Sequence, residues 1–174
     1  MGYTLDELAA DIRHTLGADP GAAAKAAVCG LVARALTDAA FVATHLKDRP
    51  AGGHPREVLY EDPELGFCIC GHVYPKAALG SPHDHGSSWA IYGQAAGVTE
   101  MTEWKIVENG KDGGPATVEP VETYLMNPGD VRLYDVGAVH SPKRETPVKL
   151  IRIEGRNLDH VARSNIRAKE PAAP

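Results

Sequence analysis

Cysteine is scarce in this sequence, and its arrangement argues against a disulfide-stabilised fold. The 174 residues include three cysteines, an odd number without the spacing of a disulfide framework, so we expect reduced thiols. Cys68 and Cys70 are separated by one residue, which does not match the CxxC motif of a redox or zinc site. We therefore expect both sulfurs to line the core or a pocket.

Long apolar segments and an excess of basic residues are also missing. No stretch is long and apolar enough to span a membrane, and the first eight residues include Asp6 and Glu7 instead of the apolar run of a signal peptide. The 18 Lys and Arg residues against 23 Asp and Glu residues give a net charge of −5. Because nucleic-acid binding requires a basic face, we predict a soluble, cytoplasmic protein with no nucleic-acid or membrane partner.

The length and composition fit one globular domain. Hydrophobic residues make up 43% of the chain and charged residues 24%, which is ordinary for a soluble protein. We find no internal repeat. We predict a single domain over residues 1–167, with N-terminal helices in 1–49, a β-barrel in 56–157 and a flexible tail in 168–174. A monomer or a homodimer is expected.

Residues 3–49 have helical patterns. Thr4 and Glu7 form a capping box, followed by one apolar face that ends at Gly17. Asp19 and Pro20 are a second start signal, and a break is expected at residues 37–38. We expect these helices to cover the outside of a β core.

From Arg56 onward, short segments rich in Val, Ile, Tyr and Leu alternate with turn residues. Asn109-Gly110 is a strong hairpin signal. This pattern indicates an all-β sandwich or barrel, including the double-sheet jelly roll. Seven strands are predicted, at residues 56–60, 67–74, 88–95, 99–107, 116–125, 130–134 and 148–155.

Three histidines are candidate metal ligands. His83 and His85 are two residues apart, so on a strand both imidazoles leave the same face and can share one metal ion. A third ligand is needed to hold a metal well. His140 is the best candidate, because Gly129 and Gly137 bracket a short strand just before it.

The segments around these histidines resemble the two signature motifs of the cupin superfamily. In the second motif, the spacing of Gly129, Gly137 and His140 matches, with Asp135 where proline is usual and Arg144 where asparagine is usual. In the first motif His83, His85 and Gly97 match, but Ala90 stands where cupins carry a metal-binding glutamate.

The resemblance implies a cupin double-stranded β-helix, a jelly-roll barrel that binds a metal through His83, His85 and His140. Three neutral imidazoles leave the metal charge uncompensated and several coordination positions open. Fe(II) held in this way can take an anionic substrate together with O2, with Zn, Ni or Mn as alternatives. A cupin that binds metal without catalysis, or three core histidines without metal, is the other interpretation.

Among three-histidine cupins, the chain is most similar to the thiol dioxygenases, meaning cysteine dioxygenase and 3-mercaptopropionate dioxygenase. In that family an arginine or glutamine at the start of the upstream strand binds the substrate carboxylate, and Arg56 falls at this place. A guanidinium binds a carboxylate through two hydrogen bonds, although a surface ion pair is an equally good account of Arg56. The family's Ser-X-His-X-Tyr set is replaced by Leu150, Arg152 and Glu154.

Arg152 and Glu154 share one strand face, which lines the barrel interior if the register follows the family. Arg152 could then bind a substrate carboxylate, and Glu154 could accept a proton or bind an ammonium group. An Arg–Glu pair on an exposed face is the alternative. Tyr92 shares the face of Ala90 and could supply a hydroxyl near the metal.

The sequence therefore predicts a non-heme iron(II) dioxygenase that oxidises a small thiol or carboxylate substrate with O2, giving a sulfinate if the substrate is a thiol. The alternatives are a non-thiol dioxygenase, a metal-dependent lyase, or a metal-binding cupin without catalysis. The expected partners are a small-molecule substrate and O2.

Overall fold

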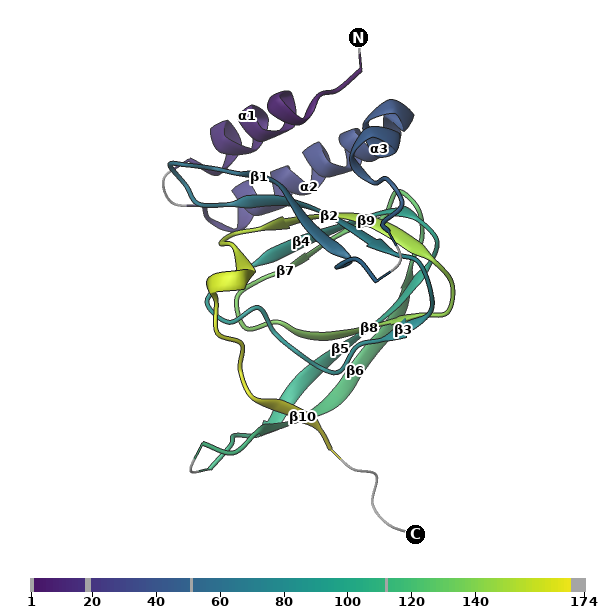
Figure 1. Ribbon diagram of the computed structural model, residues 1–174. Helices are drawn as coiled ribbons and strands as arrows, with labels where there is room; N and C mark the ends of the chain where they lie inside the picture. Colours follow the sequence, from purple (N-terminus) through teal and green to yellow (C-terminus); the bar gives the residue numbers. More distant parts are fainter. Residues whose placement is uncertain (1, 18–19, 51, 112, 170–174) are drawn as a thin grey trace.

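The computed structural model describes residues 2–17, 20–50, 52–111 and 113–169 (Figure 1). Three helices come first in the chain, and the later elements are strands apart from one short 3-10 helix. The helices are α1 (Leu5–Leu16), α2 (Ala22–Thr37) and α3 (Ala39–His45). The strands are β1 (Arg56–Glu61), β2 (Cys68–Tyr74), β3 (Ala78–Leu79), β4 (Ala90–Ala96), β5 (Thr99–Glu108), β6 (Ala116–Met126), β7 (Val131–Tyr134), β8 (Val139–Arg144), β9 (Val148–Glu154) and β10 (Ile166–Ala168), with the short 3-10 helix η1 (Leu158–His160) before β10.

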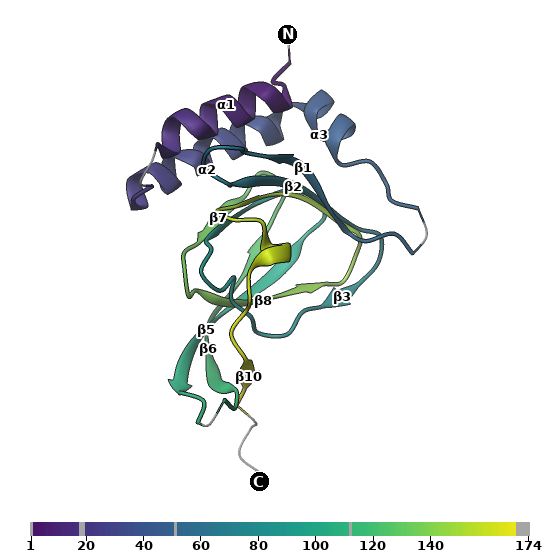
Figure 2. The same cartoon turned by 60° about the vertical axis from the view of Figure 1, so that its left-hand side comes forward.

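The strands form two five-stranded sheets that face each other (Figure 1). The first has the order β1-β2-β9-β4-β7 and the second the order β10-β6-β5-β8-β3. Strand β9 pairs antiparallel with both β2 and β4, so strands far apart in sequence lie side by side. This arrangement is a jelly-roll barrel, and the predicted fold class is confirmed. Beyond the barrel, β5 and β6 continue as a long hairpin (Figures 1 and 2).

The helices cover the outer face of the first sheet (Figure 2). The predicted capping box is present, with the Thr4 side chain accepting from the Glu7 backbone N–H, and Gly17 ends α1 with a φ of 59°. The predicted start of α2 at Asp19 lies outside the described residues, and the helix begins at Ala22. The helical run is interrupted at Asp38, as expected, and the Asp38 side chain caps the N-terminus of α3.

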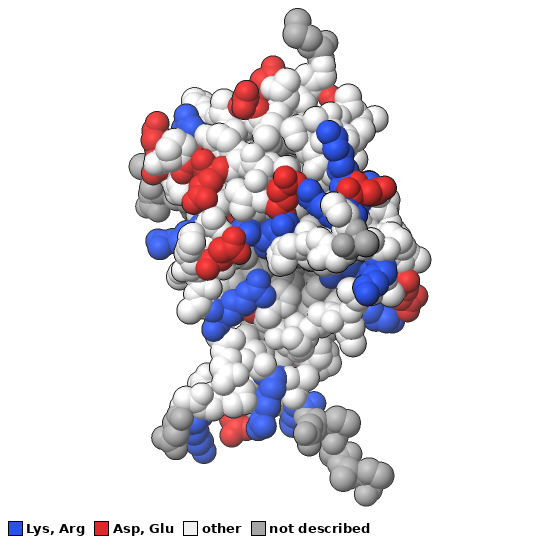
Figure 3. All heavy atoms as spheres, in the orientation of Figure 1, with Lys and Arg blue, Asp and Glu red and all other residues white. Residues whose placement is uncertain are grey.

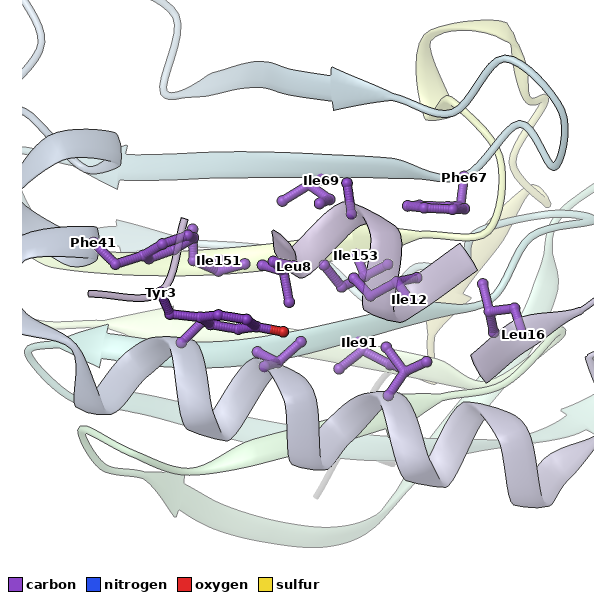
Figure 4. Packing of buried hydrophobic residues seen from close by; sticks show 14 of the residues in the cluster. Tyr3, Leu8, Ile12, Leu16, Phe41, Phe67, Ile69, Ile91, Ile151 and Ile153 are labelled. Atoms are coloured by element: carbon purple, nitrogen blue, oxygen red, sulfur yellow. The ribbon is translucent and has the colours of Figure 1, made fainter. Parts of the chain in front are cut away.

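The main hydrophobic core lies between these helices and the first sheet (Figure 4). Leu8 and Ile12 of α1 meet isoleucines on three neighbouring strands, and all are fully buried. The isoleucines are Ile69 on β2, Ile91 on β4, and Ile151 and Ile153 on β9. They occupy odd-numbered positions. Because side chains alternate along a strand, the even-numbered positions of these strands face the barrel interior.

The seven predicted strands are confirmed to within two residues at each end. Strand β8, which contains His140, was not among these seven, and neither were β3 and β10. Ala168, which the predicted tail includes, is the last residue of β10. Residues 170–174 lie outside the described part of the chain, so the tail itself stays a prediction.

Charged side chains of both signs are interspersed over the face shown in Figure 3. Among the described residues, no single helix is long and apolar enough to cross a membrane. Helices α2 and α3 reach this length and hydropathy only when taken together, and the chain bends by 91° between them. Helix α2 packs on α1, β4 and β7.

Candidate metal centre

The three predicted metal ligands come together inside the barrel. His83 and His85 lie between β3 and β4, and His140 lies on β8. Two backbone hydrogen bonds of 3.0 Å join His83 to His140, one in each direction. One ligand nitrogen from each of the three imidazoles can be chosen so that all lie within 4.8 Å of one another. The two motifs, which are far apart in sequence, therefore form one site.

A tight turn holds the first two histidines in place. Asp84 lies between the two histidines in sequence and is not part of the histidine cluster. Its carboxylate accepts hydrogen bonds from the backbone N–H of Gly86 and from Ser164. Gly86 has a φ of 57°, and a Cβ there would lie 2.1 Å from the carbonyl oxygen of Ala162. Only glycine fits such a position well. The segment after η1 therefore anchors the His83–His85 segment.

The imidazoles are kept neutral, which is the form that binds metal. Burial lowers the pKa of His83, lowers the pKa of His85 to about 2, and lowers that of His140 well below its usual value. His83 Nδ1 lies 2.9 Å from the carbonyl oxygen of Ser81. Nδ1 must carry the proton to donate to this oxygen, so the Nε2 lone pair is free. These three residues fit a divalent transition metal.

Tyr92 lies directly beside these ligand nitrogens. Its hydroxyl oxygen is 3.1 Å from His85 Nε2, 3.4 Å from His140 Nε2 and 3.2 Å from a terminal nitrogen of Arg152. The side chain comes from β4 and the residue is 4% exposed. The predicted hydroxyl near the metal is thus within reach of the site.

Arg152 and Glu154 face the barrel interior, as the alternation along β9 requires. Nε of Arg152 donates to Oε1 of Glu154 over 2.8 Å, and the Nη2 group contacts the same oxygen. The two residues therefore form the mutual pair that was weighed as an alternative, but they form it inside the barrel and not on an exposed face. Arg152 and Tyr92 also line a cavity beside His83.

Arg56 binds the other side of the Glu154 carboxylate. Its Nε and Nη2 groups donate to the two carboxylate oxygens over 3.0 and 2.8 Å. Nη1 donates to Asp159 over 2.7 Å, and Nη2 also reaches the side-chain oxygen of Asn157. The guanidinium of Arg56 is therefore engaged by the protein itself and does not line the cavity beside His83.

Glu154 is a buried carboxylate held ionised between two arginines. Burial would raise its pKa, but the hydrogen bonds from Arg56 and the charge of Arg152 outweigh this and hold the pKa below its usual range. The backbone N–H of Leu158 adds a further hydrogen bond of 3.1 Å. A carboxylate stabilised in this way is a weak base, and its geometry suits positioning Arg152.

The cavity beside His83 has a volume of about 320 Å³. Sequence reasoning missed several of its wall residues, of which Arg144 is the most informative. Arg144 lies four residues after His140 on β8, so the strand alternation could have placed it on the same face. His72 is buried and also lines this cavity. Tyr134, also missed, stacks on the His140 ring with 4.1 Å between ring centres.

No protein-family model matches the chain, and no curated protein matches it. Solved structures do show a similar architecture. One is an uncharacterised protein with a double-stranded β-helix domain from Klebsiella pneumoniae, with 15% identity, 69% of this chain and 85% of that chain covered, and a TM-score of 0.47. Another is a cupin superfamily protein from Desulfitobacterium hafniense, with 13% identity, coverage of 67% and 88%, and a TM-score of 0.47.

A third similar structure is KdgF from a Halomonas species, with 18% identity, coverage of 70% and 86%, and a TM-score of 0.43. Similarities of this size carry no argument about activity.

Proposed function

We propose that this cupin is a metal-dependent dioxygenase that oxidises a small thiol-bearing acid with O2. The observation that carries the proposal is a set of three neutral imidazoles, from His83, His85 and His140, beside a cavity. Within the described part of the chain, no carboxylate joins this cluster. Ala90, at the position of the cupin glutamate, is fully buried and offers no ligand atom. The resemblance of the histidine motifs to those of thiol dioxygenases supports the thiol as substrate.

Fe(II) is the proposed metal, with Zn, Ni and Mn as alternatives, because imidazole ligands suit several transition metals. When bound, it supplies a site where thiolate and O2 meet and where electrons pass between them. The reaction R–SH + O2 → R–SO2H balances without a co-substrate. Sulfur loses four electrons, O2 gains four, and both oxygen atoms enter the sulfinate.

The residues around the histidines have distinct roles in this proposal. The Tyr92 hydroxyl lies where it can hold a hydrogen bond to a sulfur or oxygen atom of the substrate. Arg152 fixes the direction of this hydroxyl through its contact of 3.2 Å, and Glu154 fixes Arg152. Glu154 and Arg56 are thus positioning residues, whereas Tyr92 and Arg152 line the cavity beside His83.

The proposal is tested by metal analysis and oxygen uptake. The protein is reconstituted with Fe(II) without air and supplied with 3-mercaptopropionate, cysteine, mercaptosuccinate and cysteamine, with sulfinate detected by mass spectrometry. We expect about one iron per chain, O2 uptake with at least one acidic thiol, and loss of both in His140→Ala. His160→Ala is the matched control, because His160 is exposed and lies in η1.

One iron per chain with no O2 uptake across the thiol panel would contradict the thiol reaction. Uptake with non-thiol acids would then favour a different dioxygenase, and turnover without O2 would favour a metal-dependent lyase. If His140→Ala kept its metal, the metal centre itself would be refuted.

A further inference from the structure

Arg144 is a buried arginine without a counter-ion. The residue is 6% exposed. Among the residues that the structure describes, its guanidinium makes no hydrogen bond or ion pair, and its Nε is buried without any partner. Its guanidinium lies over the face of the Tyr74 ring, whose centre is 4.0 Å from Cζ. Burying a charge in this way is unfavourable unless a partner or a function compensates.

The other two buried arginines of the barrel show the usual solution. Arg56 and Arg152 both bind the Glu154 carboxylate. Burial lowers the pKa of Arg144, and the nearby charge of Arg152 acts in the same direction. Arginine nevertheless remains a cation at neutral pH. An anion is therefore missing from the surroundings of Arg144 in the described part of the protein.

The cavity beside His83 offers the place for that anion. Arg144, Arg152 and Arg163 all line it, together with His83 and Tyr92, and none of its wall residues is acidic. Arg163 is exposed, whereas Arg144 is buried. A concave wall of one charge sign raises the local concentration of oppositely charged small molecules. The cavity therefore selects for anions.

We propose that Arg144 binds the carboxylate of a small organic acid whose opposite end reaches the histidines. Residues four apart on a strand are about 13 Å apart along the backbone, and the long Arg144 side chain shortens this span. A guanidinium binds a carboxylate through two parallel hydrogen bonds. Arg144 thus takes the role that the sequence resemblance assigned to Arg56. The placement of the reacting end of the substrate at the histidines rests on the proposed function. The binding of its carboxylate by Arg144 does not.

The test measures binding without turnover. Zn(II)-loaded protein is titrated by calorimetry with propionate, succinate and the uncharged analogue propionamide. We expect at least one of the acids to bind, propionamide not to bind, and Arg144→Gln to weaken acid binding by tenfold or more at unchanged zinc content. Arg132→Gln is the matched control, because Arg132 also lies over a tyrosine ring, that of Tyr124, but is exposed and outside the cavity wall. Its acid affinity should not change.

A second readout separates binding from a structural role. Arg144→Gln should unfold at the same or a higher temperature without ligand, and it should lose the increase in Tm that the acid gives the wild type. If Arg144→Gln fails to fold, Arg144→Lys keeps the charge but loses the two-donor face, so it should fold and bind the acid more weakly.

Equal acid binding by wild type and Arg144→Gln would overturn the inference, and so would equal binding of propionate and propionamide. Arg144-dependent acid binding combined with no O2 uptake for any thiol would leave this site standing and remove the proposed thiol reaction. The two proposals can therefore fail separately.

Discussion

Replacing Glu154 by glutamine should be among the most destabilising single changes in the barrel. The carboxylate receives five hydrogen bonds, two each from Arg56 and Arg152 and one from the Leu158 backbone. Glutamine keeps one acceptor oxygen and turns an NH2 group toward arginine donors. Removing one partner of a buried ion pair costs about 3–5 kcal/mol, because uncompensated charge remains. For a chain of this size, this corresponds to a Tm decrease of about 6–20 °C.

The measurement is urea unfolding of both proteins at pH 7, followed by circular dichroism. Glu119→Gln serves as the control, because Glu119 pairs with Lys169 on the surface and exposed pairs add little. Adding Arg152→Met to Glu154→Gln removes one unpaired cation, so part of the lost free energy of unfolding should return. A loss below about 1 kcal/mol for Glu154→Gln would refute the reasoning, because it would mean that water solvates this carboxylate.

The difference between the two proteins should also depend on pH. The pKa of Glu154 is lower in the folded protein than in the unfolded chain. Its stabilising contribution is therefore fully present above the unfolded value of about 4.3 and is lost as the pH falls through the folded value. The stability gap between wild type and Glu154→Gln should be constant from pH 6 to 8 and narrow in acid.

Two further changes test other parts of the structure. Tyr92→Phe removes the hydroxyl beside His85 and His140. O2 uptake should therefore fall by about 10²-fold or more, while the metal content stays unchanged. Loss of the metal would contradict this, because Tyr92 would then be required for the structure of the centre. Gly93→Ala places a Cβ 2.5 Å from Cγ1 of Val32, so the helical layer must shift. The free energy of unfolding, measured in urea, should fall by about 1–3 kcal/mol. An unchanged free energy of unfolding would contradict the described packing of α2 on β4.

Local patterns were enough to predict the helical region and seven of the described strands. The capping box at Thr4 and the alternation on β2, β4 and β9 act over a few residues, so they can be recognised in the sequence. The spacing of His83 and His85 is equally local, whereas the grouping of His140 with them was expected from the resemblance of the two motifs. Strands β3 and β10 have two and three residues and no pattern of their own. They exist because β8 and β6 offer them a free edge.

The partners of the buried charges could not be predicted in this way. Arg56 and Glu154 are 98 residues apart, and they meet because β1 and β9 both pair with β2. Register depends on the packing of whole sheets. The resemblance assigned carboxylate binding to Arg56, but the guanidinium of Arg56 is paired with Glu154. Among the described residues, the guanidinium of Arg144 has no such partner.

A count of the interior charges connects the two proposals. Glu154 and Asp159 balance Arg56 and Arg152, so this network is neutral as a whole. Arg144 adds one positive charge, and a divalent metal on three neutral imidazoles adds two more. A substrate with one carboxylate and one thiolate compensates two of these three charges, one at each end of the cavity.

A thiol without a carboxylate leaves Arg144 uncompensated, and an acid without a thiol leaves the metal with most of its charge. Cysteamine should therefore be a much poorer substrate than 3-mercaptopropionate, and Arg144→Gln should narrow this difference in kcat/KM by lowering only the value for the acid.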